Sequence, residues 1–290
     1  MHKRSILFLT AIGILCTFFS CKQETIFYQI EQETELEEAV ITGIVTSVVE
    51  FNGKLYACDG RIYSKGVNDI RGWQSFSKPD GYIEKLATGA NVLFAMNSSK
   101  EVFSFDGKDW TRVELPDFDK DETVTIFCDG AGNAYIRIAN SYRDLAPNQA
   151  MNPSSIEITS PVILKANGIL FTAKDGAVSD ALGGTVSDLG KVWALTYSAT
   201  EKAVYAGTNS GLKKLPLDES GKLSGKTESV PGSNAESTLK DYEVFAVLAT
   251  GDSLDNAALY ASTVESGSSN TNVFGLWGYY YNRRNSWNVE

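Results

Sequence analysis

Few side chains in this sequence are of the kinds that catalyse reactions. The single histidine is His2, beside the first methionine. A Ser-His-Asp or Cys-His relay needs an imidazole in the folded domain, and imidazole is also the commonest nitrogen ligand of zinc, copper and iron. Removal of the segment that carries His2 would therefore exclude both kinds of site. Enzymes that use carboxylates, tyrosine, lysine or arginine remain possible.

A run of acidic residues, Asp117, Asp119, Asp121 and Glu122, has the spacing with which a calcium loop begins. An EF-hand loop needs glycine at its sixth position and a carboxylate at its twelfth, where this sequence has Glu122 and Cys128. We therefore interpret the run as a solvated connection. Neither a metal nor a cofactor is predicted.

The densest aromatic and basic cluster lies near the end of the chain, between residues 277 and 284. Aromatic residues and arginine are enriched among the residues that dominate binding energy at interfaces. Alternation along a strand would place Tyr279 and Tyr281 on the same face. An ordinary outer strand followed by a charged turn is the alternative. The candidate partner-binding residues are Trp277, Tyr279, Tyr281, Arg283 and Arg284.

Two cysteines, Cys58 and Cys128, lie well beyond the N-terminal region. They occupy different places in the repeat described below, so a disulfide is not indicated, although an oxidising compartment would permit one. We interpret both as small buried side chains.

The first 20 residues have the layout of a secretory signal peptide. Lys3 and Arg4 precede an apolar stretch from residue 6 to 19, which is shorter than the ~20 residues that a membrane-spanning helix needs. Residues 17–21, Thr-Phe-Phe-Ser-Cys, resemble the lipobox of bacterial lipoproteins, with Phe18 where leucine is usual. The resemblance implies that Cys21 becomes the lipid-bearing first residue. Cleavage nearby that leaves Cys21 as a free thiol is the alternative.

The mature chain is expected to be strongly acidic. Of 26 basic residues the leader removes Lys3 and Arg4, which leaves 24 against 36 acidic residues and a formal charge of −12. Such a charge repels phosphate backbones, so no nucleic-acid partner is predicted. Residues 21–44 include six glutamates and are interpreted as a solvated tether. A short amphipathic helix around Ile26, Ile30 and Leu36 is the alternative.

The elements that would position any site are indicated by a repeated phrase. An aromatic residue between small or aliphatic neighbours occurs six times, at intervals of 38, 41, 36, 34 and 55 residues. A period of about 40 residues carried by short strands is typical of a β-propeller. The phrases are apolar at successive positions, as strands covered on both faces require, so we interpret them as corresponding inner strands. Their aromatic residues are Tyr56, Phe94, Tyr135, Phe171, Tyr205 and Tyr260.

The first two repeats can be divided into strands by their turn residues. In the first we expect strands at 47–51, 54–58, 61–64 and 73–76, and in the second at 85–88, 92–96, 101–105 and 110–113. Asn52-Gly53 and Asp59-Gly60 are dipeptides that tolerate the positive φ of tight hairpins. The alanines beside the aromatic residues should leave room for the aromatic ring of a neighbouring blade. A tryptophan also begins the outer strand of the first, second and last repeats, at Trp73, Trp110 and Trp287.

Residues 204–218, within the fifth repeat that begins at Val192, resemble the propeller repeats of bacterial two-component sensor proteins. Gly207, Thr208, Gly211 and Leu212 occupy the Gly-Thr and Gly-Leu places of that pattern. The other repeats keep only the apolar-aromatic core. The resemblance implies a propeller-bearing bacterial envelope lipoprotein, concerned with ligand sensing or protein contact, and brings no catalytic residue with it.

We therefore predict an all-β protein whose residues 45–290 form a β-propeller of about six four-stranded blades, with seven possible. Residues 39–45 are expected to add a strand to the last blade. The predicted function is a non-catalytic, lipid-anchored module of the cell envelope, periplasmic or surface-exposed, that binds a protein or carbohydrate. One alternative is an envelope enzyme, a glycosidase or lyase, with carboxylates in the central funnel. The other is a scaffold for outer-membrane protein assembly.

Overall fold

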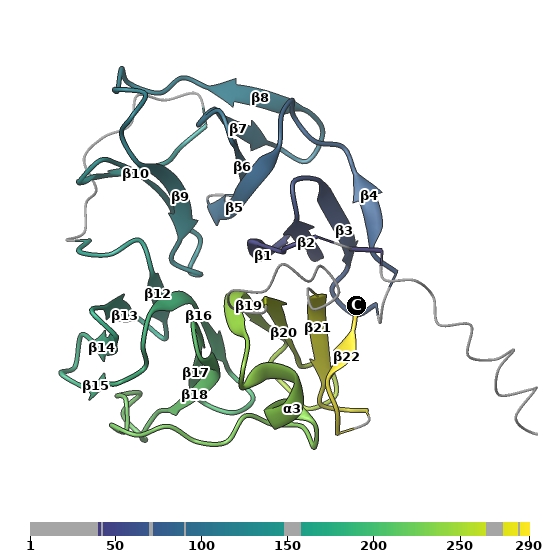
Figure 1. Ribbon diagram of the computed structural model, residues 1–290, viewed down its shortest axis with the longest axis vertical. Coiled ribbons are helices and arrows are strands. Elements are labelled where there is room, and N and C mark those ends of the chain that lie inside the picture. Colours follow the sequence, from purple (N-terminus) through teal and green to yellow (C-terminus); the bar gives the residue numbers. More distant parts are fainter. Residues whose placement is uncertain are drawn as a thin grey trace, which may run out of the picture. The chain divides into compact units, whose positions relative to one another are not determined.

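The computed structural model describes residues 40–147, 158–264 and 275–290, apart from 42, 70, 71, 90 and 284. Six antiparallel sheets follow one another along the chain and form the blades of a β-propeller (Figure 1). The predicted fold class is therefore confirmed. Four sheets have four strands, and the third and fifth have three strands within the described residues.

Each blade is built from consecutive strands, ordered from the ring axis outward. The first holds β1 (Ser47–Phe51), β2 (Lys54–Cys58), β3 (Ile62–Gly66) and β4 (Gln74–Phe76), and the second holds β5 (Ile83–Gly89), β6 (Val92–Asn97), β7 (Val102–Phe105) and β8 (Trp110–Val113). The third has β9 (Val124–Cys128), β10 (Ala134–Ile138) and β11 (Ser141–Asp144), and the fourth has β12 (Ile163–Ala166), β13 (Ile169–Lys174), β14 (Ala177–Asp180) and β15 (Thr185–Val186). The fifth has β16 (Val192–Ser198), β17 (Ala203–Thr208) and β18 (Gly211–Pro216), and the last has β19 (Glu243–Thr250), β20 (Ala258–Val264), β21 (Gly275–Tyr280) and β22 (Asn288–Val289).

The turn residues act as expected in the first hairpin. Asn52 and Gly53 have φ of 49° and 69°, and they connect β1 to β2 in a register that pairs Phe51 with Lys54. A two-residue turn with two positive φ values matches the twist of the strands that it joins.

The repeated phrases occupy the second strand of their blades, one strand away from the axis. They lie in β2, β6, β10, β13, β17 and β20, which are equivalent positions in the six sheets. The prediction that the phrases correspond to one another is confirmed, but they are the second strand of each blade and not the innermost, as the division of the first repeat indicates for residues 54–58. All six aromatic residues are at most 4% exposed: Tyr56, Phe94, Tyr135, Phe171, Tyr205 and Tyr260.

Neighbouring blades pack an aromatic residue of one against an alanine of the next. Phe94 of the second blade shares a core cluster with Ala134 of the third, and Tyr205 of the fifth shares one with Ala261 of the last. Tyr260 of the last blade similarly shares a cluster with Ala57 of the first. Small residues at these places let the sheets approach closely, which supports dense packing around the ring.

The three recurrent tryptophans connect each outer strand to the blade before it. Trp110 Nε1 donates a hydrogen bond to the Ser77 carbonyl, which follows the first blade, at 3.0 Å. Trp287 Nε1 donates to the Pro231 carbonyl at 2.7 Å, and Trp73 Nε1 donates to Glu290 Oε2 at 3.0 Å. Each recurrent tryptophan thus donates to the chain that follows the preceding blade, twice to a backbone carbonyl and once to a carboxylate.

The six sheets share no strand, so no strand pairing joins the last blade to the first. These two blades contact one another through their side chains. Ile41 and Val45, 2% and 1% exposed, pack in the cluster that includes Ala57 and Tyr260. The expectation that residues 39–45 add a strand to the last blade is wrong: the described residues of this segment form no strand, and its apolar side chains fill the interface instead.

One short helix is present among the described residues, α3 (Ala235–Leu239), in the connection between β18 and β19. No helix in this part of the chain is long and apolar enough to cross a membrane. The predicted leader, the lipid-bearing Cys21 and residues 22–39 of the predicted tether lie outside the described residues. The described end of the predicted tether is not all solvated, because Ile41 is 2% exposed.

Candidate functional site

The inner strands surround a pocket of about 260 Å³ at the axis of the ring. All six blades contribute to it, through β1, β5, β9, β12, β16 and β19 or the residues just before them. From β1, β12 and β16 the contacts come from the beginning of the strand, from β5 and β19 they come from nearer its middle, and from β9 they come from the last four residues. The pocket therefore lies in the central channel of the ring, and we call it the channel mouth.

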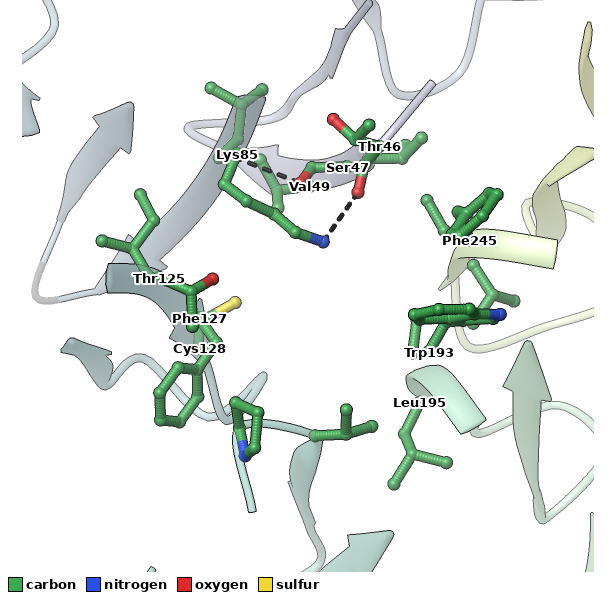
Figure 2. A pocket seen from close by; sticks show the side chains of 18 of the residues that line it. Thr46, Ser47, Val49, Lys85, Thr125, Phe127, Cys128, Trp193, Leu195 and Phe245 are labelled. Carbon is green, nitrogen blue, oxygen red and sulfur yellow. Dashed lines mark hydrogen bonds between the residues drawn. The ribbon is translucent and has the colours of Figure 1, made fainter. Parts of the chain in front are cut away.

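Lys85 is the one charged residue among those that line this pocket. Its Nζ extends into the channel and donates a hydrogen bond to the Thr46 carbonyl at 3.0 Å (Figure 2). Lys85 forms no salt bridge with any described residue. An ammonium group has three protons to donate, so two of them remain for solvent or a bound molecule.

The opposite wall of the pocket is aromatic. The rings of Trp193 and Phe245 lie with their centroids 4.8 Å apart, at 47° to one another (Figure 2). The Nζ of Lys191 lies 3.7 Å from the centroid of the Trp193 ring. A cation over an indole face is attracted by the negative face of the ring. Lys191 itself is exposed and is not among the residues that line the pocket.

Irregularities in three inner strands coincide with these residues. The register of β5 against β6 shifts between Ile83 and Lys85, and that of β16 against β17 shifts around Trp193. The register of β19 against β20 shifts between Val244 and Val247, around Phe245. A β-bulge changes the direction of a side chain and is common beside functional sites. The backbone thus departs from regular pairing where the lysine and both aromatic residues enter the channel.

Burial affects the ionisation of the groups around Lys85. Desolvation lowers the pKa of Lys85, because protein surrounds the side chain even though it faces the channel. The thiols of Cys58 and Cys128 act on it in the opposite direction. Cys58 is fully buried, and burial raises its pKa to about 11. Cys128 lines the channel, and both cysteines are free thiols.

The lining of the mouth suits binding better than proton transfer by paired groups. Its other members are aliphatic, aromatic, hydroxyl-bearing or thiol side chains and one proline, and none of these lining residues is Asp, Glu or His. A pair of carboxylates, the arrangement of glycoside hydrolysis, is not found in this lining. Apolar walls with one placed charge are typical of small-molecule sites.

The aromatic residues predicted to bind a partner are largely engaged in contacts within the last blade and with the fifth blade. Tyr279 is 7% exposed and donates a hydrogen bond to Asn285 Oδ1 at 3.1 Å, and its ring contacts Tyr281 at 5.0 Å. This contact agrees with the predicted shared face. Tyr281 donates to Glu201 Oε2 at 2.7 Å. Whether this surface binds a partner stays a prediction.

Two further members of that predicted site differ in their surroundings. Trp277 is half-buried, and its Nε1 donates a hydrogen bond to Thr263 Oγ1 at 2.8 Å. Arg283 is exposed, and Arg284 lies outside the described residues. The acidic run is also at the surface, with Asp117, Asp119 and Asp121 exposed. No group of three His, Cys, Asp or Glu able to hold a metal occurs where the structure describes the chain.

The channel mouth was not predicted from the sequence, although a signal for it existed. Lys85 is the first residue of the strand that we expect to be innermost in the second blade. An alignment of the expected innermost strands of the six blades would show a charged residue at this position. Trp193 and Phe245 depend on bulges, which the alternation of residue types does not reveal.

Comparison with known proteins connects the chain to lipoproteins. The model of the TP013X lipoprotein family matches residues 3–211. An uncharacterized lipoprotein of Treponema pallidum (strain Nichols) is 24% identical over 233 residues, which cover 80% of this chain and 54% of that protein. A second uncharacterized lipoprotein of the same organism is 29% identical over 114 residues, 38% of this chain and 30% of that protein. The chain thus spans about half or less of the length of these curated relatives.

Solved structures that resemble the chain are distant in sequence. A protein of unknown function from Bacteroides thetaiotaomicron VPI-5482 is 12% identical, with a TM-score of 0.48 over 77% of this chain and 67% of that one. The extracellular domain of a proposed one-component system from B. thetaiotaomicron is 13% identical, with a TM-score of 0.45 over 76% of this chain and 31% of that one.

Proposed function

Because the chain belongs to the TP013X lipoprotein family, we propose that it is a lipid-anchored recognition module of the bacterial cell envelope. In this proposal Cys21 carries the lipid, the acidic segment after it acts as a tether, and the propeller binds a partner without catalysing a reaction. The family match includes residue 21 and the apolar stretch before it, which supports the anchor. Several acyl chains give stable membrane attachment, whereas one gives only a marginal one.

The observation that carries the proposed role is the composition of the channel mouth. Six inner strands converge on one pocket with apolar and aromatic walls, a single ammonium group and no carboxylate among the lining residues. This lining counts against a carboxylate-based glycosidase or lyase in the central funnel, because such an enzyme needs acidic side chains beside its substrate. A binding role needs only a shaped surface and a few placed polar groups.

The anchor is tested by substituting the proposed lipid-bearing residue. We expect the Cys21→Ser variant to lose incorporation of a labelled fatty acid and to leave the membrane fraction. Cys16→Ser is the matched control, because Cys16 lies inside the apolar stretch of the leader and should remain labelled at Cys21. Equal labelling of the Cys21→Ser variant and the wild type would show that the anchor is wrong.

Partner binding is tested on the intact, membrane-attached protein. Cross-linking of cells followed by affinity capture should recover a specific protein, or a glycan array should show a specific carbohydrate ligand. The surface at Trp277, Tyr281 and Arg283 is the candidate contact. Absence of both a captured protein and a bound glycan, with the propeller folded, would contradict the proposed recognition role.

A further inference from the structure

We propose that the channel mouth is a binding site for a small organic anion, whose acid group contacts Lys85 and whose apolar body lies against Trp193 and Phe245. This inference rests on the proposed recognition function and names the ligand class that the pocket fits. The charge of the mouth, the shape of its walls and the irregular backbone that creates them support it.

The charge of the mouth favours an anion. Lys85 lies in a lining of mostly apolar side chains with some hydroxyl and thiol groups, and a backbone carbonyl is its one protein hydrogen-bond partner among the described residues. The cost of burying a charge is largest when no opposite charge is nearby, and an acid group in the pocket would supply it. Lys191, which is exposed and lies over the face of Trp193, adds a positive charge beside one lining residue without lining the pocket itself. Charge-assisted hydrogen bonds of this kind are stronger than neutral ones.

The walls favour an apolar, flat body on that anion. Across the mouth from Lys85 lie the rings of Trp193 and Phe245, and the Phe127 ring, Pro161 and Leu195 complete the apolar lining (Figure 2). Aromatic walls stack well on flat rings and exclude water from a neighbouring ion pair. A volume of about 260 Å³ admits a molecule of the size of one or two fused rings with an acid group.

The backbone supports a site that is built for a ligand. Register shifts at Lys85, Trp193 and Phe245 occur in three different blades, and all three side chains meet at the same mouth. Each register shift disrupts the regular pairing of its strand and should lower stability. Because all three shifts lie beside the same pocket, we infer that they are kept for binding there.

The test uses two probes that differ only in charge, 2-naphthoate and its neutral amide, 2-naphthamide. Calorimetric titration of the wild-type protein at pH 7 should show one site for naphthoate and binding of naphthamide that is weaker by about 10- to 100-fold, since a hydrogen bond to a charged group has that value. Lys85→Met should remove the discrimination between the two probes. Lys54→Met, at an exposed lysine of β2, is the matched control and should keep it.

A second readout places the probe in the channel without any variant. Cys128 lines the mouth, whereas Cys58 is buried and serves as an internal reference. Naphthoate should slow alkylation of Cys128 by iodoacetamide, measured by mass spectrometry, while naphthamide at the same concentration should do so much less. This measurement keeps the proposal testable if the Lys85→Met protein does not fold.

Equal affinity of the wild type for naphthoate and naphthamide, or naphthoate binding that leaves Cys128 alkylation unchanged, would overturn the anion site. Neither measurement depends on whether an envelope partner is captured. Failure of the anion site can therefore be distinguished from failure of the proposed function.

Discussion

Lys65 and Glu290 form a buried ion pair between the first and the last blade, although 225 residues separate them in the sequence. Their side chains are 0% and 1% exposed. The Lys65 ammonium also lies 4.7 Å from the ring centroid of Tyr260, and Trp73 donates a second hydrogen bond to the same carboxylate. Burial lowers the pKa of Lys65, and Glu290 opposes that shift. The contact lies where the ring closes.

Removal of one partner of this pair should be strongly destabilising. We expect Glu290→Gln to lower the free energy of unfolding by about 3–5 kcal/mol, because it removes the ion-pair partner of the buried Lys65 ammonium. The double variant Lys65→Met/Glu290→Gln should recover most of the loss, since no buried charge remains and glutamine still accepts from Trp73. Urea denaturation followed by circular dichroism measures both changes.

An exposed ion pair supplies the control for that measurement. Lys240 and Glu236 lie 2.6 Å apart with side chains that are 59% and 77% exposed. Glu236→Gln should change stability by less than about 0.5 kcal/mol. A similar loss in the Glu290→Gln and Glu236→Gln variants would contradict a special role for the buried pair.

A glycine at a close approach of two blades should not tolerate a side chain. A Cβ on Gly207 would lie 2.5 Å from the Val244 carbonyl oxygen of the neighbouring blade. The backbone of a neighbouring strand can shift only by disturbing its sheet. Gly207→Ala should therefore lower the free energy of unfolding by about 1–3 kcal/mol. Gly275→Ala is the comparison, because the nearest atom there is 3.4 Å away in the Trp277 side chain, and it should change stability by no more than about 0.5 kcal/mol. Equal effects would refute the proposed contact.

The buried Cys58 thiol should make stability depend on pH. Burial raises its pKa from 9.0 to about 11. Between these values the unfolded chain loses the proton while the folded protein keeps it, so this contribution is complete below pH 9 and falls as pH rises towards 11. The loss should approach about 2–3 kcal/mol.

Comparison with the Cys58→Ala variant measures that contribution together with the coupling of Cys58 to Lys85. Lys85, whose pKa is lowered, changes stability in the opposite direction at alkaline pH and is present in both proteins. The difference in unfolding free energy between wild type and variant, measured by urea titration from about pH 8 to 11, should therefore decrease as pH rises. A constant difference across this range would show that the thiol does not titrate as expected.

Structural and binding roles at the last blade can be separated with two substitutions. Tyr281→Phe removes a donor to Glu201 and should cost about 1–2 kcal/mol of stability. Arg283→Ala changes an exposed residue and should alter stability by less than about 0.5 kcal/mol. If this surface binds a partner, Arg283→Ala should reduce capture while the fold stays intact. Unchanged capture would place the partner elsewhere.

Local patterns in the sequence were sufficient to predict the propeller. The spacing of Tyr56, Phe94 and Tyr205 predicted equivalent strands, because each blade repeats the same burial in about 40 residues. Asn52-Gly53 predicted a hairpin, because a tight turn with positive φ needs those residue types. Most expected strands of the first two blades match the structure to within two residues, and 47–51, 54–58 and 110–113 match it at both ends.

The tertiary structure alone decided how the ring closes and what lies at its axis. The Lys65–Glu290 pair joins residues of the first and the last blade, which are far apart in the sequence. No local sequence pattern relates the two residues. The place of residues 39–45 was mispredicted for the same reason, since Ile41 and Val45 pack between two blades that are distant in sequence. Likewise, Lys85, Trp193 and Phe245 come together from three blades through bulges. Turn chemistry and strand burial depend on nearby residues, whereas a channel mouth depends on six strands meeting in space.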